Sequence, residues 1–324
     1  MGELCLSTKI YFYGNIYCWH RRQYLLLLRN FTLKRYINLL LAISSGLLCW
    51  AAWPASPLTF LIFAAWVPLL WLADTVKSRK KFFGLVYITM FAWNVSTTWW
   101  VWNASAPGAV AAFLANSFIM CLPWLGFIIV KKRMGQTLGY LSLVAFWMCF
   151  EYIHLHDWGL SWPWLTMGNV FALHPEWVQW YEYSGSSGGT LWILLVNIFL
   201  FLHIKTNYAR PEGKKYNKLI TGVLLLAAPI LLSRVMAVHK AKPSDNANVV
   251  VVQPNIDPYE KVATGTFETQ LQKLIHTSEK AIDSNTALVV WPETALYMET
   301  PIDELHMRDN FLLAPLWGFL KRNP

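Results

Sequence analysis

The chain of 324 residues is 56% hydrophobic and only 14% charged, whereas soluble domains carry roughly 25% charged residues. This composition excludes a soluble globular protein as the main interpretation, and it equally excludes a disordered chain, a collagen and a coiled coil. The mean hydropathy of +0.35 and the 19 tryptophans indicate a protein embedded in lipid, with indole rings at the bilayer interface.

The net charge of +9 would suggest a nucleic-acid partner if the basic residues clustered on a soluble domain. Residues 1–233 carry 18 Lys and Arg against 7 Asp and Glu, whereas residues 234–324 carry 9 against 11. The excess positive charge therefore lies wholly in the hydrophobic part of the chain. We expect membrane lipids as partners and no nucleic acid.

Seven apolar stretches are long enough, or nearly long enough, to cross a bilayer, which takes about 20 helical residues. They are Tyr36–Trp53, Leu58–Ala73, Phe82–Trp102, Gly108–Val130, Leu138–Ile153, Leu191–Ile204 and Leu219–Met236. Every Lys and Arg before Arg234 lies in the amino-terminal tail or in the second, fourth or sixth gap between these stretches. Because short cytoplasmic loops retain Lys and Arg, the amino terminus is predicted to be cytoplasmic and the region after Met236 external.

The chain thus divides into four predicted parts. These are a cytoplasmic extension over residues 1–35, a membrane domain of about seven helices over 36–236, a linker over 237–247 and a carboxyl-terminal domain over 248–324. In the extension, the run Leu25–Leu28 is too short to span and lies between Arg22 and Arg29. We interpret the extension as interfacial or poorly ordered.

The cysteines show no CxxC spacing and all lie in the hydrophobic part, at Cys5, Cys18, Cys49, Cys121 and Cys149. They are predicted to pack as small apolar residues rather than to form disulfides or a metal site. His154, His156 and Asp157 could be metal ligands, but the third or fourth ligand that would complete a metal site is not evident in the sequence. We expect neither a metal nor a cofactor.

The segment His154–Thr190, called here the Trp-rich segment, has no Lys or Arg but five tryptophans. One interpretation is an aromatic belt that anchors a loop at the outer interface. The other is a substrate-facing surface, in which Trp162 and Trp164 on either side of Pro163 shape an entrance for an acyl chain. Glu151, just before this segment, is either a functional intramembrane carboxylate or a group that reaches water.

The carboxyl-terminal domain begins with Val249–Val252, which predicts a strand buried on both faces. A one-sided apolar pattern from Phe267 predicts a helix of about 18 residues, and Ala287–Trp291 predicts a second buried strand that ends at Pro292. Strand, helix and strand in this order favour a parallel pair at the start of an α/β domain. Glu293 follows the second strand, where catalytic groups often lie, although most such carboxylates are solvated surface residues.

These segments carry a resemblance to a known family. Gln253-Pro254-Asn255 after the first strand and Trp291-Pro292-Glu293 after the second resemble the opening of the carbon-nitrogen hydrolase, or nitrilase-like, domain of the apolipoprotein N-acyltransferase family. In the membrane part, Asn94–Trp102 and Gly159–Gly168 are similar to segments of the same family. The resemblance covers roughly Tyr36 to Tyr297. It implies a multi-span helical membrane domain followed by an α-β-β-α sandwich.

The resemblance also implies an enzyme of the bacterial inner membrane with its carboxyl-terminal domain on the periplasmic side. Such an enzyme moves an acyl chain from a phospholipid donor to the α-amino group of the diacylglyceryl-cysteine of a lipoprotein acceptor. The family uses a Cys thiolate as nucleophile, a Glu as general base and a Lys that stabilises the oxyanion. Glu293 matches the Glu, and Trp162 and Trp164 are the predicted substrate-binding residues.

After Glu293 the sequence contains one lysine, Lys321, which is too close to match the family's Lys, and no cysteine. We therefore expect an amino-terminal portion of such an enzyme with an incomplete nitrilase-like domain, exposed sheet edges and no activity by itself. The alternative is a non-catalytic membrane protein that binds lipid or lipoprotein through the Trp-rich segment. A transporter is disfavoured because the predicted spans hold few ionisable residues.

Overall fold

The computed structural model describes residues 33–54, 56–209, 216–239, 248–256, 267–292, 295–296 and 313–322. Most of the predicted amino-terminal extension and of the predicted linker lies outside these ranges. The chain forms two compact units, one made by most residues up to His239 and the other by the segment from Lys240 onward.

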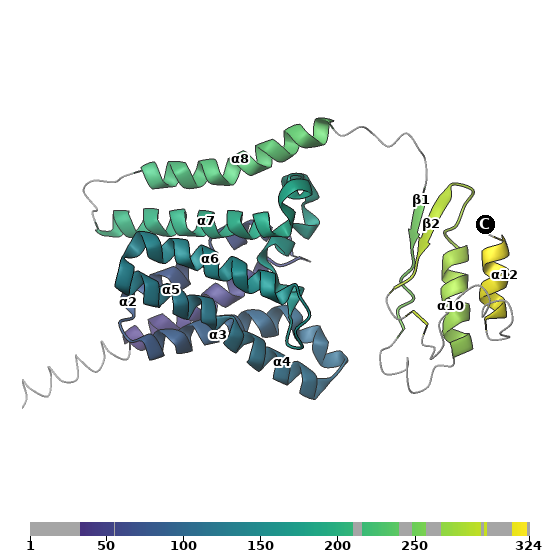
Figure 1. Cartoon of the computed structure of the whole chain (residues 1–324), viewed down its shortest axis with the longest axis horizontal. Coiled ribbons are helices and arrows are strands. Elements are labelled where there is room, and N and C mark those ends of the chain that lie inside the picture. Colours follow the sequence, from purple (N-terminus) through teal and green to yellow (C-terminus); the bar gives the residue numbers. More distant parts are fainter. Residues whose placement is uncertain are drawn as a thin grey trace, which may run out of the picture. The chain divides into compact units, whose positions relative to one another are not determined.

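The first unit is a bundle of helices (Figure 1). It begins with a helix over residues 33–51, followed by η1 Thr59–Phe63, α2 Val67–Thr75, α3 Arg79–Thr98, η2 Trp99–Asn103, α4 Ala106–Ile119, α5 Cys121–Met134 and α6 Gln136–His154. Three 3-10 helices come next, η3 Pro163–Leu165, η4 Met167–Leu173 and η5 Pro175–Trp177. The unit ends with α7 Tyr181–Ala209 and α8 Asn217–His239.

Each of the seven predicted apolar stretches lies on helical segments of this unit. Three helices of the described residues are long and apolar enough to cross a membrane, Ala106–Met134, Tyr181–Ala209 and Asn217–Ala237, and Thr59–Thr75 is a shorter apolar helical stretch. The unit is therefore that of a membrane protein. The number of seven spans remains a prediction.

The second predicted span is broken between η1 and α2, and buried polar side chains satisfy the backbone at the break. Asn197 of α7 accepts a hydrogen bond from the Trp66 amide at 2.8 Å and donates to the Ile62 carbonyl at 2.8 Å. Ser45 donates to the Ala65 carbonyl at 2.6 Å. Non-helical backbone at membrane depth is tolerated only where such partners exist. Asn197 thereby fixes α7 against the start of α2.

Four tryptophans, Trp66, Trp93, Trp124 and Trp147, are fully buried in the core of the bundle. The rings of Trp66 and Trp147 meet edge to face with their centroids 4.5 Å apart, and Trp66 and Trp124 are 4.9 Å apart. The prediction that the indoles lie at the bilayer interface is wrong for these four. Their large rings instead join α3, α5 and α6 to the start of α2.

The helix over 33–51 lies very close to α3. A Cβ atom at Gly46 would come within 2.5 Å of the Thr89 carbonyl oxygen, so glycine allows this approach. At the same level the Thr89 hydroxyl donates to the Ala42 carbonyl at 2.8 Å. This contact brings the carboxyl-terminal ends of the two helices together.

The second unit contains β1 Asn248–Val251, α10 Phe267–Glu279, β2 Thr286–Val290 and α12 Ala314–Arg322. The two strands pair in parallel, with Val249 opposite Leu288 and Val251 opposite Val290. The predicted parallel pair with an intervening helix is therefore confirmed. The predicted helical face is also confirmed, since Leu271, Leu274, Ile275 and Ser278 are buried. The helix has 13 residues rather than about 18.

The start of β2 is tied to β1 through the side chain of Asp283. Its carboxylate accepts hydrogen bonds from the Thr286 hydroxyl at 2.9 Å, the Asn285 amide at 3.0 Å and the Asn248 side-chain amide at 2.9 Å. These hydrogen bonds, that of Thr286 first, hold the pKa of Asp283 below its usual value.

The prediction of strands buried on both faces is wrong for the described residues. Val249, Val251 and Leu288 are 58%, 74% and 54% exposed. The reason is that only two strands pair in the described part of this unit, so the sheet has an uncovered apolar surface of the kind expected for an incomplete layer. A parallel strand pair with helices is observed; the complete nitrilase-like sandwich is not.

Helix α12 was not predicted from the sequence. Its Leu316 and Phe319 pack with Leu271 and Ile275 of α10 and with Leu313 just before α12 in a small core. The spacing of three between Leu313, Leu316 and Phe319 is the pattern that could have revealed it.

Replacing Asn197 by Leu tests its role at the break in the second predicted span. The variant leaves the buried Trp66 amide without an acceptor, which should lower the free energy of unfolding by about 1–3 kcal/mol. Titration of the purified protein in mixed detergent and dodecyl sulfate micelles measures this change. Asn169→Leu, at an exposed position, is the control and should unfold as the wild type does. Equal stability of Asn197→Leu and the wild type would contradict the assigned role.

Candidate functional site

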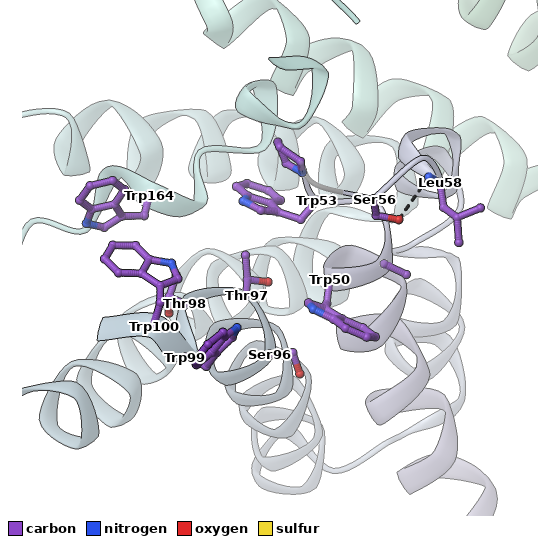
Figure 2. A pocket seen from close by; sticks show the side chains of 12 residues that line it. Trp50, Trp53, Ser56, Leu58, Ser96, Thr97, Thr98, Trp99, Trp100 and Trp164 are labelled. Atoms are coloured by element: carbon purple, nitrogen blue, oxygen red, sulfur yellow. Dashed lines mark hydrogen bonds between the residues drawn. The ribbon is translucent and has the colours of Figure 1, made fainter. Parts of the chain in front are cut away.

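A cavity of about 610 Å³ lies at the end of the bundle where the helix over 33–51 and α3 terminate (Figure 2). Its volume falls within the range of roughly 300–1,000 Å³ that is typical of small-molecule sites. Three separate segments line it with the following residues: Trp50, Ala51, Trp53, Pro54, Ser56 and Leu58; Ser96, Thr97, Thr98, Trp99 and Trp100; and Trp164.

Indole rings dominate this Trp-lined cavity. Trp50, Trp99, Trp100 and Trp164 are between 40% and 61% exposed, unlike the tryptophans of the core. Figure 2 shows Trp100 facing Trp164, and their ring centroids lie 5.2 Å apart at an interplanar angle of 82°. The two membrane segments that carry the family resemblance, Asn94–Trp102 and Gly159–Gly168, therefore meet here.

The cavity also contains hydroxyl groups. The Thr98 hydroxyl donates to the Asn94 carbonyl at 2.7 Å, and the Ser56 hydroxyl accepts from the Leu58 amide at 3.3 Å. The Thr97 hydroxyl oxygen is buried and has no hydrogen-bond partner. Since a buried polar group normally has a partner, Thr97 offers a free hydrogen bond beside the cavity. The described lining contains hydroxyl groups but no acid, base or thiol.

The carboxyl group of Glu151, near the end of α6, holds the Trp-rich segment in place. Its Oε1 accepts hydrogen bonds from the Trp147 indole at 2.8 Å and the Met167 amide at 2.9 Å. Its Oε2 accepts from the Thr190 hydroxyl at 2.6 Å. Glu151 is only 4% exposed, so it does not reach water. The residue therefore joins α6, η4 and α7.

Gly168 extends this connection between η4 and α7. Its amide donates to Thr190 Oγ1 at 3.1 Å, and its carbonyl accepts from the Tyr181 hydroxyl at 2.8 Å. A Cβ atom at Gly168 would lie 1.9 Å from the Ser186 carbonyl oxygen, so only glycine fits. The part of the Trp-rich segment before α7, and with it Trp164, is therefore fixed to α7 through the backbone of Gly168.

The structure separates the two predicted substrate-binding tryptophans. Trp164 lines the Trp-lined cavity, whereas Trp162 packs against the hydrophobic core and its amide donates to His154 Nδ1 at 2.9 Å. His156 and Asp157 make local hydrogen bonds. The His156 ring donates to the Tyr152 carbonyl, and the Asp157 carboxylate accepts from the Gly159 amide. Among the described residues, no group of three or more His, Cys, Asp or Glu side chains could hold a metal ion.

Thr97–Trp100 lie within Asn94–Trp102, a segment that carries the family resemblance, but the sequence did not assign them to a site. Trp50 and Trp53 were not predicted as site residues at all. An available signal was the position of the indoles at the ends of predicted spans, where aromatic residues meet the interface. Which indoles share one cavity depends on helix packing.

The carboxyl ends of β1 and β2 lie at one edge of the second unit. The Val252 amide donates to the Val290 carbonyl at 2.9 Å, so Gln253 and Pro292 follow side by side from neighbouring strands. Asn255 has a φ of 48°, which Asn tolerates better than most residues. The Trp291 indole donates to the Ser278 hydroxyl at 2.9 Å and ties this edge to α10. Glu293 itself lies outside the described residues, and its role remains a prediction.

The described cysteines are placed as follows. Cys49 and Cys121 are buried in the bundle, and Cys149 is exposed on α6. Cys121 Sγ lies 3.1 Å from the Ser117 carbonyl, as is usual for a small residue packed in a helix. Cys5 and Cys18 lie outside the described residues.

Together the helical bundle and the cavity at its end define an integral membrane protein with a site of small-molecule size. Comparison with known proteins gives the family. Residues 45–199 match the family model described as the apolipoprotein N-acyltransferase N-terminal domain. The resemblance predicted from the sequence is therefore confirmed for this part of the chain. All residues that line the Trp-lined cavity, together with Glu151 and Thr190, fall within the matched range.

Two curated relatives extend the match beyond the membrane part. The chain is 29% identical over 298 residues to an apolipoprotein N-acyltransferase of Chlorobaculum tepidum, covering 90% of this chain and 54% of the relative. It is 25% identical over 266 residues to an apolipoprotein N-acyltransferase of Geobacter metallireducens, covering 79% of this chain and 51% of the relative. The chain thus spans about half the length of the curated relatives it matches.

Substitutions at Glu151 test its positioning role. In Glu151→Leu, three donors lose their acceptor, and each unpaired buried donor costs about 1–3 kcal/mol. The Trp-rich segment should then detach and be cut by chymotrypsin at least tenfold faster, whereas Glu151→Gln keeps most of the hydrogen bonds and should stay resistant. Glu176→Leu, which removes an exposed carboxylate of the same segment, is the control. Unchanged cleavage of Glu151→Leu would refute the role.

Proposed function

We propose that this chain acts in the N-acylation of lipoproteins, in which an acyl chain passes from a phospholipid to the α-amino group of a diacylglyceryl-cysteine. The observation that carries the proposal is the convergence of Thr97, Trp100 and Trp164 on one cavity within the matched domain. The names of both relatives support the same activity.

In this proposal the Trp-lined cavity binds the acyl chain of a lipid substrate next to its ester group. Indole rings supply large, rigid apolar surfaces at low cost in conformational entropy. The unpartnered Thr97 hydroxyl is suited to donate a hydrogen bond to an ester carbonyl, because it has no other partner. Trp100 and Trp164 hold the chain between two segments, of which Glu151 anchors the one that carries Trp164.

The proposed chemistry has two acyl transfers. A thiolate attacks the phospholipid ester carbonyl, the lysophospholipid leaves and a thioester forms. The lipoprotein amine then attacks the thioester, so that an amide forms and the thiol is released. Glu293 is proposed as the general base that removes the proton from thiol and amine in turn. Residues 294–324 contain no cysteine, and the proposal assigns the thiol to no residue of this sequence.

The proposed location is the bacterial inner membrane, with about seven spans and with the second unit in the periplasm, as a nitrilase-like domain. The alternation of basic gaps along the sequence supports this orientation. Trp164 and Glu293 would then lie on the same side of the membrane as the maturing lipoproteins.

The orientation is tested by labelling single cysteines in a variant without the native five. We expect cysteines at Ser161 and Ser284 to react with an impermeant maleimide added to spheroplasts. A cysteine at Lys80, exposed at the start of α3, should react only after the membrane is permeabilised. Labelling of Ser284→Cys only after permeabilisation would refute the proposed orientation.

The proposed function is tested with a synthetic diacylglyceryl-cysteinyl peptide and phosphatidylethanolamine that carries a labelled acyl chain. Trp100→Ala and Trp164→Ala should each weaken binding of the lipid substrates at least fivefold, since an aromatic contact with the acyl chain is lost. Trp158→Ala removes an exposed indole of the same segment that does not line the cavity, and it should bind normally.

The role of Glu293 is read from the rate of acyl transfer in the same assay, measured for this chain fused to the carboxyl-terminal part of the Chlorobaculum tepidum relative that the match does not cover, because residues 294–324 supply no thiol. Loss of the general base in Glu293→Gln should lower this rate about 100-fold or more, whereas Cys149→Ala should leave it unchanged. Binding through the cavity combined with a transfer rate that does not depend on Glu293 would favour the alternative, a non-catalytic membrane protein that binds lipid or lipoprotein. Binding that is insensitive to Trp100 and Trp164 would refute the assigned site.

A further inference from the structure

Two further cavities lie at the amino-terminal end of α6, away from the Trp-lined cavity. Both cavities include Gln136, the first residue of α6. The Trp-lined cavity instead includes Trp164, which comes after α6 has ended at His154. A helix of 19 residues is about 28 Å long, so the two regions are well separated along the bundle. The pair therefore does not belong to the candidate site described above.

The first cavity of the pair is polar and has a volume of about 490 Å³. It lies where α6 begins, α7 ends and α8 begins, and its polar residues are Gln136, Lys205, Thr206, Asn217 and Lys218. The second cavity is apolar and has a volume of about 330 Å³. It continues between α6 and α7, along Leu141, Val144, Leu195, Ile198 and Phe199.

The two cavities adjoin, because Gln136, Leu202 and Lys218 line both of them. A polar compartment with lysines thus lies next to an apolar cavity, called here the apolar channel. This order of chemistry matches that of a phospholipid, in which a charged head group is attached to an acyl chain. Free phosphate would use only the polar compartment.

The polar compartment carries more positive than negative charge. Lys205 and Lys131 both pair with the single carboxylate of Asp74. Lys218 donates to the Thr206 hydroxyl at 2.9 Å, and no carboxylate in the described part of the chain forms an ion pair with it. Two lysines therefore share one aspartate and Lys218 has no carboxylate partner among the described residues, which leaves an excess positive charge that an anion would balance.

The apolar channel borders the edge of the bundle. Helix α8 packs along α7 (Figure 1), and only 11% of its most apolar stretch is buried. Leu224 and Leu231 of α8 and Leu141 of α6 are all at least 60% exposed. In a membrane these surfaces contact lipid tails, so an acyl chain can enter the channel sideways from the bilayer.

We propose that these two cavities form one binding site for an anionic phospholipid, whose phosphate contacts Lys218 and Lys205 and whose acyl chain lies between α6 and α7. Basic pockets between membrane helices bind anionic head groups elsewhere by the same physics. The bound lipid fills the space between α6 and the end of α7 and is not the acyl donor. The site is independent of the proposed function, since it uses none of the residues around the Trp-lined cavity.

The test is native mass spectrometry of the purified full chain, titrated with phosphatidylglycerol or with phosphatidylcholine of the same acyl chains. The wild type should retain one phosphatidylglycerol at a concentration at least tenfold lower than it needs for phosphatidylcholine. Lys218→Gln should weaken phosphatidylglycerol binding about fivefold, and Lys218→Glu should weaken it further. Lys80→Gln and Lys80→Glu make the same changes at an exposed lysine on α3 and should bind as the wild type does.

A second variant tests the apolar channel. Val144→Phe narrows the channel without changing the charge, so it should weaken phosphatidylglycerol binding. In a separate competition with the wild type, inorganic phosphate at 10 mM, or about a hundred times the lipid concentration, should not displace the lipid. The proposal is overturned if phosphatidylcholine binds equally well, if Lys218 and Lys80 variants behave alike, or if phosphate displaces the lipid and Val144→Phe has no effect. Thermal unfolding of each variant shows that it remains folded.

Discussion

The hydrogen bonds to the buried carboxyl group of Glu151 are the constraint on which the candidate site depends. A carboxyl group in the interior of a membrane protein is costly unless its oxygens have partners. Here Trp147, Met167 and Thr190 supply three donors from α6, η4 and α7. The cost of burial is thereby offset only when the Trp-rich segment is folded back on the bundle, and this places Trp164 opposite Trp100.

Asn197 serves the same purpose inside the bundle. The break between η1 and α2 would leave backbone groups unpaired at membrane depth, and Asn197 supplies both a donor and an acceptor to them. Glu151 and Asn197 thus each provide partners for backbone groups at a point where the chain departs from a regular helix. Between these points the aromatic core around Trp66 and Trp147 provides the packing.

The two ends of the bundle offer two different environments for lipid. The Trp-lined cavity is aromatic, includes the buried unpartnered hydroxyl of Thr97 and has no charged residue in its described lining, which suits a neutral acyl ester. The cavities around Lys218 are basic and lead into an apolar channel, which suits an anionic lipid that stays bound. If both proposals hold, the membrane part of the protein distinguishes a substrate lipid from a structural lipid by charge.

The sequence by itself determined the membrane class, the positions of the helical stretches, the family and the parallel order of β1 and β2. These features depend on local composition, charge alternation and short motifs such as Gln253-Pro254-Asn255. Only the tertiary structure decided that Trp66 and Trp147 form a core, that Trp164 rather than Trp162 lines the cavity and that Glu151 anchors the Trp-rich segment. Hydropathy is the same for a tryptophan in the core and one at the interface, so these roles follow from contacts between residues that lie far apart in the chain.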